Sequence, residues 1–271
     1  MRDQTGRGPR HQTAGHLHRT RAKSLSAELI ALSGLILLAA YFIRGTSGFG
    51  SGLVAIPIMA LWLPLTFVVP LMLLLDFSAS VMLSGVNLRQ VNWREIRTLI
   101  PFSIIGILLG THLLTSLPMQ PMLITLSVFV AIFGFRSLFN LHGDKPISRK
   151  WAIPAGLGGG TVGSLFGTGG PPYIIYLGHR ISDKTALRAT FSGLILIEGS
   201  LRISSFAYAG LFSDTRLLFS YLAAMPVVAL GLTLGHRAHV GLSREQMMRL
   251  IGLLLLGSSI SLMVKAFAAQ S

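Results

Sequence analysis

The stretch SLFGTGGPPYII, from Ser164 to Ile175, places a glycine cluster and two adjacent prolines between apolar residues. Glycine and proline both interrupt regular helices. At membrane depth such a break leaves backbone N–H and C=O groups without helical partners, which is tolerated only where they are buried in protein or line a polar cavity. This stretch therefore indicates a broken helix, provided that the surrounding chain lies in a membrane.

The composition around this stretch is that of a membrane protein. Only 12% of the 271 residues are charged and the mean hydropathy is +0.66, whereas soluble domains contain about 25% charged residues. Segments that approach the length of about 20 apolar residues needed to cross a bilayer are predicted, with soft edges, at 27–44, 66–88, 98–117, 121–141, 151–180 (broken), 189–212, 216–236 and 247–268. The sequence thus predicts an all-α integral membrane protein with about eight transmembrane elements.

Charge and cysteine content narrow the function classes. The net charge is +14 and there is no cysteine, so disulfides, thiol catalysis and cysteine-ligated metals are excluded, and we expect no metal or other cofactor. The basic residues lie mainly in an N-terminal tail, residues 1–27, and in loops, where they orient spans and do not indicate a nucleic-acid partner. We expect this tail to be disordered and cytoplasmic. A cleaved signal peptide with Leu29–Ile43 as its apolar core is the alternative, although no small-residue cleavage site follows cleanly.

The chain repeats itself. Gly45, Thr46, Gly48, Gly52 and Pro57 recur at one constant separation as Gly160, Thr161, Gly163, Gly167 and Pro172, and Pro101, Gly106, Gly110 and Leu117 recur further on as Pro226, Gly231, Gly235 and Leu242. We therefore divide the chain into the tail 1–27, a first transmembrane repeat 28–141, a connecting loop 142–150 and a second repeat 151–269, each repeat with one broken element and three helices. If element 151–180 enters and leaves the membrane on the same side, the two repeats are inverted. If it crosses the membrane, they are parallel, and the sequence does not decide between these two arrangements.

Duplicated halves with interrupted hydrophobic segments are typical of secondary transporters, whose substrates bind near the bilayer midplane between the repeats. Free N–H groups and the positive end of the helix dipole at the start of a half-helix favour an anion. The candidate substrate-binding residues are Arg44, Gly48, Gly50, Gly52 and Pro57 in the first repeat and Gly167, Thr168, Gly169, Gly170, Pro171 and Pro172 in the second. The alternative is that these glycines only permit close helix packing and that Arg44 extends to the headgroups. For two further glycines, Gly106 and Gly110, packing is the interpretation we favour.

Two carboxylates lie well inside predicted spans, where charge is costly and usually functional. Asp76 and Glu198 occupy nearly equivalent places in the two repeats, and Arg202 follows Glu198 by one helical turn. A carboxylate in a low-dielectric site binds a proton more readily, so both are candidates for proton coupling. The alternative is structural: Glu198 and Arg202 form an ion pair, and Asp76 is satisfied by a neighbouring helix.

The chain resembles the sulfite exporter TauE/SafE family of membrane permeases. The resemblance rests on GTSGFGSGLVAIP (45–57), GTVGSLFGTGGPP (160–172), VNWREIRTLIPFSIIGILLGTHLLTSLP (91–118) and TALRATF (185–191), and covers roughly Leu29 to Ala268. It implies two repeats of about four helices and the transport of anions, often sulfite, sulfonates or other sulfur-containing organic acids. Ser51 and Leu53 stand near positions that family members often fill with glycine, so unequal contributions from the two halves are expected.

These observations predict a multi-pass permease of the cytoplasmic (inner) membrane, with a cytoplasmic N-terminus, that moves a small anion, sulfite or a sulfonate for example, with a proton as a candidate coupling ion. The expected partners are the anion and the lipid bilayer, and a homo-oligomer is left open. Two other classes stay in view: a membrane scaffold without transport activity, which would leave the glycine breaks and buried carboxylates without a role, and an intramembrane enzyme, for which no catalytic constellation is found. We expect no enzymatic activity.

Overall fold

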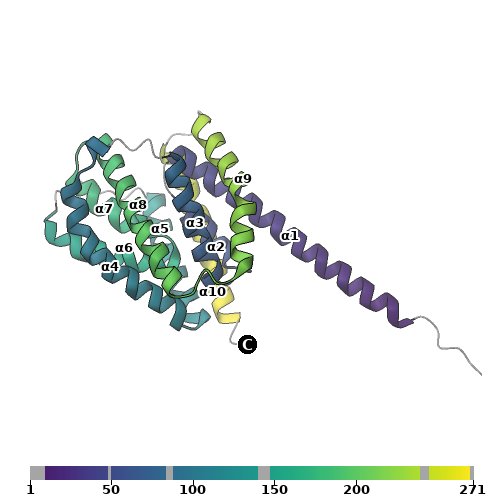
Figure 1. Cartoon of the computed structure of the whole chain (residues 1–271). Helices are drawn as coiled ribbons and strands as arrows, with labels where there is room; N and C mark the ends of the chain where they lie inside the picture. The colour runs from purple at the N-terminus through teal and green to yellow at the C-terminus, as the bar shows by residue number, and fades with distance from the viewer. Residues whose placement is uncertain (1–9, 48–49, 84–87, 140–146, 239–243, 269–271) are drawn as a thin grey trace, which may run out of the picture.

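The computed structural model describes residues 10–47, 50–83, 88–139, 147–238 and 244–268. All regular secondary structure in these ranges is helical, which confirms the all-α prediction (Figure 1). The α-helices are α1 (Arg10–Ser47), α2 (Ser51–Met59), α3 (Leu65–Leu83), α4 (Trp93–Ser116), α5 (Met119–Phe139), α6 (Ala152–Phe166), α7 (Gly170–Arg180), α8 (Lys184–Tyr208), α9 (Thr215–Arg237) and α10 (Arg244–Ala268). Two 3-10 helices, Leu88–Gln90 and Arg149–Trp151, precede α4 and α6.

Five stretches of the described helices are long and apolar enough to cross a membrane: Glu28–Thr46, Leu65–Met82, Trp93–Ser116, Met119–Arg136 and Thr215–Arg237. Helix α8 lies where a span was predicted at 189–212, but Glu198 and Arg202 lower its hydropathy. In α10 the apolar part is the shorter segment Leu255–Phe267. The count of about eight transmembrane elements therefore stays a prediction.

Helix α1 begins earlier than the sequence indicated. Residues 1–9 lie outside the described part of the chain, and from Arg10 onward the predicted tail belongs to α1, which extends well beyond the bundle (Figure 1). The physical reason is composition: between Arg19 and Leu32 the chain contains mostly Ala, Leu, Arg, Lys and Glu, which are strong helix formers, and neither glycine nor proline.

The second break folds the chain back on itself. Gly167 adopts a left-handed conformation with φ of 66° after α6. Helix α7 then runs antiparallel to α6, as two contacts show: Gly169 lies against Gly159, and the ring of Tyr173 also lies against Gly159. Arg149, just before α6, and Arg180, at the end of α7, both bind the carboxylate of Glu95. Helices α6 and α7 thus form a hairpin, the second hairpin, which enters and leaves at the same end of the bundle. We call this end the Glu95 end.

The first break forms a similar hairpin from the opposite end. Gly50 has φ of 100° between α1 and α2, and α2 returns along α1, so that Trp62 Nε1 lies 3.3 Å from Ser33 Oγ. The carbonyl of Ala60, just after α2, accepts a hydrogen bond of 2.8 Å from Lys265 Nζ. Lys265 is near the end of α10, which packs antiparallel to α5 and ends at the bottom of Figure 1. Helices α1 and α2 form this first hairpin, based at what we call the Lys265 end.

Glycines set the closest helix contacts. A Cβ on Gly106 or Gly110 of α4 would overlap the backbone of α6, and a Cβ on Gly231 or Gly235 of α9 would overlap the backbone of α1. Each hairpin therefore packs on a GxxxG surface of a helix from the other half, which supports the packing interpretation of these glycines. Helix α5 also packs against α10, and α3 packs against α8.

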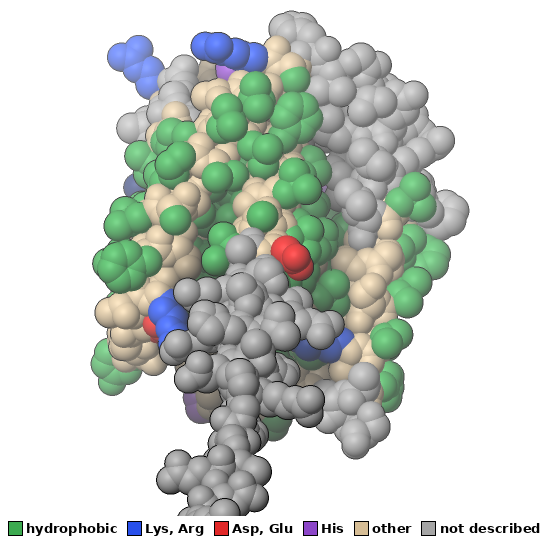
Figure 2. Space-filling view, turned by 90° about the vertical axis from the view of Figure 1, so that its right-hand side faces the viewer, with side chains coloured by type: hydrophobic (Ala, Val, Ile, Leu, Met, Phe, Trp, Pro, Cys, Tyr) green, Lys and Arg blue, Asp and Glu red, His purple; other side chains and the backbone are tan. Residues whose placement is uncertain are grey.

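The outer surface is apolar. On the side seen in Figure 2 hydrophobic side chains are widespread and few described side chains are charged, and large side chains such as Phe219, Ile260 and Leu108 are more than half exposed. An apolar surface of this extent fits contact with lipid, because soluble proteins rarely expose large contiguous apolar patches.

Candidate functional site

The tips of the two hairpins meet at a small cavity in the middle of the bundle. The cavity has a volume of about 120 Å³ and is lined by parts of α1, α2, α3, α7 and α8 and by the turn before α7. The predicted site residues that line it are Arg44, Gly50, Gly52, Asp76, Gly167, Thr168, Gly169, Gly170, Pro171 and Arg202. Pro57, Pro172 and Glu198 do not line it, and Gly48 lies outside the described residues.

Two helix starts face this cavity. In α2 the bond from the N–H of Val54 to the carbonyl of Gly50 is 3.3 Å long, so the N–H groups of Ser51, Gly52 and Leu53 precede the helical ladder. In α7 the same holds for Gly169 and Gly170, and Pro171 and Pro172 follow without N–H groups. Both ends carry the positive pole of a helix dipole, and together they favour an anion between them.

The two tips also touch each other. A Cβ on Gly52 would lie 2.8 Å from the carbonyl oxygen of Gly167, and a Cβ on Gly167 would overlap the side chain of Ile56. Glycine at these two positions is therefore needed for packing as well as for leaving the cavity open. The binding and packing interpretations of these glycines are compatible, because both residues line the cavity and also form the contact between the tips.

The first repeat contributes an arginine bound to a carboxylate. Arg44 Nη1 lies 2.8 Å from Asp76 Oδ1, which also accepts hydrogen bonds of 2.7 Å from Tyr41 and from Ser51. The second guanidinium nitrogen, Nη2, lies 2.7 Å from Ser80 Oγ. Arg44 is thus buried in the bundle and does not extend to the headgroups, and Asp76 is satisfied by neighbouring helices, as the structural alternative proposed.

The second repeat has the same side-chain types in a looser arrangement. Arg202 Nη2 lies 3.6 Å from Glu198 Oε2, and Arg202 Nη1 donates to the carbonyl of Gly163 at 2.8 Å. The other carboxylate oxygen of Glu198 lies 3.0 Å from the hydroxyl of Tyr173, and that hydroxyl lies 3.0 Å from Ser103 Oγ. Glu198 is fully buried behind the cavity, and Arg202 stands between it and the cavity.

Several buried polar atoms at this site have no hydrogen-bond partner among the described residues. They are Thr168 Oγ1, Arg44 Nε, Arg202 Nε and Glu198 Oε2. Leaving a buried polar group unsatisfied costs about 1–3 kcal/mol, so such groups are rare and call for an explanation. Three of the four belong to side chains that line the cavity, so a polar group held in the cavity could complete their hydrogen bonding.

Sequence analysis missed the tyrosines and a second carboxylate cluster. Glu95 is buried at the start of α4 and binds Tyr176 at 2.6 Å, Arg180 at 3.1 Å and Arg149 at 3.3 Å. Tyr173 and Tyr176 lie one turn apart on α7, and this spacing was the available signal for both. The Asn92-x-x-Glu95 pattern indicates a helix cap, and the side chain of Asn92 does accept a hydrogen bond from Glu95 N, so Glu95 gave no sign of a further role.

Comparison with known families decides the identity. The family model described as "Sulfite exporter TauE/SafE" matches residues 33–262, a range that includes the second hairpin, the first hairpin from residue 33 onward and the cavity. The chain belongs to the sulfite exporter TauE/SafE family. This confirms the predicted family and makes the chain a membrane protein of a transporter family. No solved structure matches it.

Two curated relatives agree with this TauE/SafE assignment. The chain is 31% identical over 195 residues, covering 71% of this chain and 81% of the relative, to a protein of Comamonas testosteroni named "Probable inner membrane transporter protein TsaS". It is 24% identical over 251 residues, covering 89% of this chain and 96% of the relative, to a protein of Cupriavidus necator named "Probable sulfite/organosulfonate exporter TauE".

Proposed function

We propose that this TauE/SafE protein is a secondary transporter that binds sulfite or the sulfonate group of a small organic acid between the hairpin tips. The observation that carries the proposal is the cavity itself, at which two helix starts converge and where arginine and threonine side chains leave buried donors without a partner. The name of the Cupriavidus necator relative, a probable sulfite/organosulfonate exporter, supports the substrate class.

The donors around the cavity suit an oxyanion with several oxygens. Thr168 supplies a hydroxyl, Arg202 supplies Nε–H, and the backbone of Gly169 and Gly170 supplies N–H groups. Hydrogen bonds from charged or backbone donors to an anionic oxygen are short and strong. Since the cavity is small, it holds the anionic group, and a larger organic substituent would extend beyond it.

Charge balance supports proton coupling at Glu198. Arg44 is balanced by Asp76 and Arg202 by Glu198, so a bound monoanion adds an uncompensated charge in a medium of low dielectric constant. A proton on Glu198 restores neutrality and frees the Arg202 guanidinium to bind the anion. The 3.6 Å separation and the unpartnered Oε2 leave room for this exchange.

The hairpins suggest how the cavity opens to alternate sides. They enter the bundle from opposite ends, and each packs on a helix of the other half, as expected for two inverted repeats. Rocking one hairpin and its packing partner against the other would expose the cavity first to one side of the membrane and then to the other. We propose this arrangement for the predicted repeats 28–141 and 151–269.

The fold also bears on orientation, because the N-terminal tail and the basic loops lie at opposite ends of the bundle. The described segments at or between helix ends on the Glu95 side contain Arg89, Arg94, Arg97, Arg136, Arg149, Lys150, Arg180, Lys184, Arg188, Arg237, Arg244 and Arg249. Among the described residues the Lys265 end has fewer: Arg216, Lys265 and, in the tail, Arg10, Arg19, Arg21 and Lys23. Cytoplasmic loops carry the excess of Lys and Arg, so we propose that the Glu95 end faces the cytoplasm and that α1 begins on the opposite side.

Flux into proteoliposomes tests the transport function. Purified protein is reconstituted, and uptake of radiolabelled sulfite and methanesulfonate is measured with and without a pH gradient, with acetate as the competing carboxylate. We expect saturable uptake of at least one sulfur anion that acetate does not inhibit and that the gradient accelerates. Folded protein that carries neither anion would contradict the proposed substrate class, whereas gradient-independent uptake would retain transport and reject proton coupling.

A further inference from the structure

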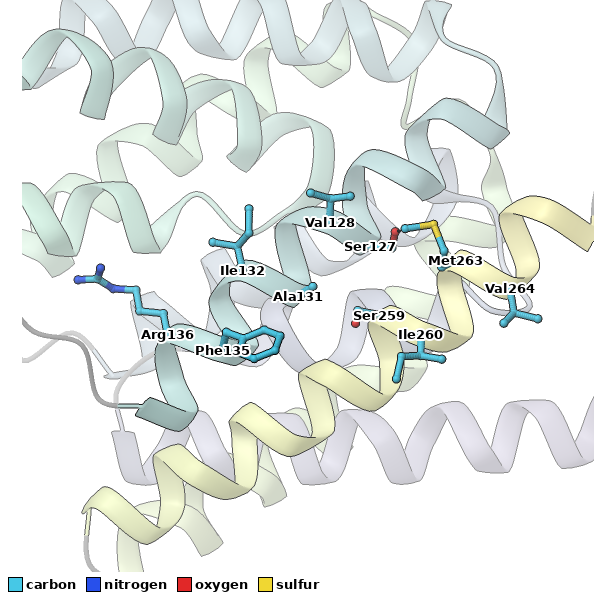
Figure 3. Close-up of a pocket in the computed structure, with 10 residues that line it drawn as sticks. All are labelled: Ser127, Val128, Ala131, Ile132, Phe135, Arg136, Ser259, Ile260, Met263 and Val264. Carbon is cyan, nitrogen blue, oxygen red and sulfur yellow. Dashed lines mark hydrogen bonds between the residues drawn. The ribbon is translucent and has the colours of Figure 1, made fainter.

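A groove on the outer surface, separate from the central cavity, lies between α5 and α10 (Figure 3). It has a volume of about 690 Å³ and is lined by Ser127, Val128, Ala131, Ile132, Phe135, Arg136, Ser259, Ile260, Met263 and Val264. The two serine hydroxyls are satisfied within the protein, Ser127 by Ile124 O and Met263 Sδ and Ser259 by Leu256 O. Apart from Arg136, the groove therefore offers only apolar contacts.

The groove has the length of one leaflet. From Val128 to Arg136 helix α5 rises by about 12 Å, and half of the hydrocarbon core of a bilayer is about 15 Å thick. Ile132, Phe135, Ile260 and Val264 are more than half exposed along it. An acyl chain that lies in this groove would cover these side chains over the depth of a single leaflet.

One end of the groove carries an available positive charge. Arg136 lies in the last turn of α5, its side chain extends past the apolar part of the groove in Figure 3, and it makes no ion pair or hydrogen bond with another described residue. This is the Glu95 end, where most basic residues of the loops lie. We proposed above that this end faces the cytoplasm, and basic pockets between helices on the cytoplasmic side of membrane proteins bind lipid headgroups.

We propose that this groove binds one acyl chain of an anionic phospholipid from the leaflet at the Glu95 end, with Arg136 bound to the lipid phosphate. A second copy of the chain would also cover the apolar walls, but it would have to supply a carboxylate or else leave the Arg136 guanidinium buried and unpaired. A phospholipid supplies both the apolar chain and the negative charge at the spacing that the groove has. The site stands independently of which anion the central cavity transports.

Native mass spectrometry of the full-length protein, incubated with phosphatidylglycerol or phosphatidylcholine in mild detergent, tests the site. We expect Arg136→Gln to lower phosphatidylglycerol binding about tenfold, the loss expected for a hydrogen bond to a charged group, with little effect on phosphatidylcholine. Ala131→Phe, which fills the groove, should lower binding of both lipids. The matched control Arg97→Gln removes one exposed charge at the same end outside the groove and should leave binding unchanged.

Two outcomes would overturn the site. The first is a binding pattern without the expected dependence: monodisperse Arg136→Gln and Arg97→Gln proteins bind phosphatidylglycerol equally, or Ala131→Phe leaves lipid binding unchanged. Either result would show that the altered residue does not contact the lipid. The other uses the absence of native cysteine: efficient disulfide crosslinking of Ile132→Cys between two copies in native membranes would show that a second chain covers the groove. Absence of this crosslink together with the expected lipid pattern supports the lipid site.

Discussion

Thr168 contributes a buried hydroxyl to the central cavity, and no described residue binds it. Thr168→Val keeps the shape and removes the hydroxyl. Because no residue in the described part of the chain makes a hydrogen bond with this group, we expect the melting temperature to be unchanged or higher. The affinity for sulfite or methanesulfonate should fall about tenfold, since a hydrogen bond to a charged ligand is lost. Equilibrium binding and thermal unfolding of the purified protein measure the two effects.

Thr190 provides the matched control. It is equally buried, but its hydroxyl oxygen accepts a hydrogen bond of 2.8 Å from Asn92 N. Thr190→Val should therefore lower the melting temperature and leave the affinity unchanged. If Thr168→Val gave this second pattern, its hydroxyl would have a structural role and the cavity would lose one of its proposed ligands.

Glu198 is expected to carry the coupled proton. Glu198→Gln retains size and hydrogen-bonding groups but cannot titrate, so uptake driven by a pH gradient should be abolished while anion binding persists. If Glu198 serves only to pair with Arg202, the substitution leaves a buried cation without its partner, which costs about 3–5 kcal/mol. The melting temperature would then fall markedly. Flux assays with and without a gradient, combined with thermal unfolding, separate the two cases.

The double variant Glu198→Gln with Arg202→Gln sharpens this comparison. In the structural case, removal of both charges should restore the stability lost in the single variant. In the coupling case the double variant remains unable to use the gradient, whatever its stability. Full gradient-driven uptake by a stable Glu198→Gln protein would eliminate the coupling role.

Helix α7 is held in the bundle by a few polar contacts. This half-helix is short, and Tyr173 and Tyr176 attach it to Ser103 and Glu95 of α4. Its end is held by Arg180, which binds Glu95 and the carbonyl of Ile147. The second hairpin is thus positioned in part by contacts at its base, so the cavity geometry depends on residues that do not line the cavity.

Glu95→Gln should loosen the second hairpin. The substitution leaves Arg149 and Arg180 without a carboxylate, and we expect a destabilisation of about 3 kcal/mol, the lower end of the range for a buried pair, because Arg149 is 39% exposed and stays partly hydrated. Thermal unfolding measures the loss. The control Asp214→Asn alters the exposed cap of α9 and should have a smaller effect, because Asn caps a helix about as well as Asp. Equal stability of the Glu95→Gln and native proteins would contradict a role in holding the hairpin.

For the whole molecule, the opposite entry of the two hairpins determines which chain segments share a side of the membrane. Both ends of the second hairpin lie at the Glu95 end, and the base of the first hairpin lies at the Lys265 end. The basic loops are therefore gathered on one side. A protein inserted in the opposite orientation would place nearly all of them outside the cytoplasm.

Cysteine labelling in intact cells checks this orientation. The native chain has no cysteine, so a single substitution gives one reactive site. Tyr208, at the end of α8, is 98% exposed at the Lys265 end, and Tyr208→Cys should react with an impermeant maleimide added outside. Lys150→Cys, at the Glu95 end, should react only after permeabilisation. The reverse pattern would instead place the tail in the cytoplasm, as its basic residues alone predict.

The sequence by itself located the breaks and the charges. Glycine and proline act through their own backbone preferences, so Gly167–Pro172 marked the interruption between α6 and α7 within the predicted element 151–180. The cost of charge in an apolar segment marked Glu198 and Asp76 in the same way, and the one-turn spacing marked the pairing of Glu198 with Arg202. The motifs around these residues were also sufficient to indicate the family.

The tertiary structure decided which of these residues meet. The pairing of Arg44 with Asp76, the binding of Glu95 by Arg149 and Arg180, and the contact of Gly52 with Gly167 all join segments far apart in the chain. Each depends on the direction in which the chain leaves Gly50 and Gly167, where positive φ angles turn a break into a hairpin. Hydropathy and helical spacing describe single segments of the chain, whereas a hairpin brings side chains of different helices together. These contacts are therefore visible only in the folded chain.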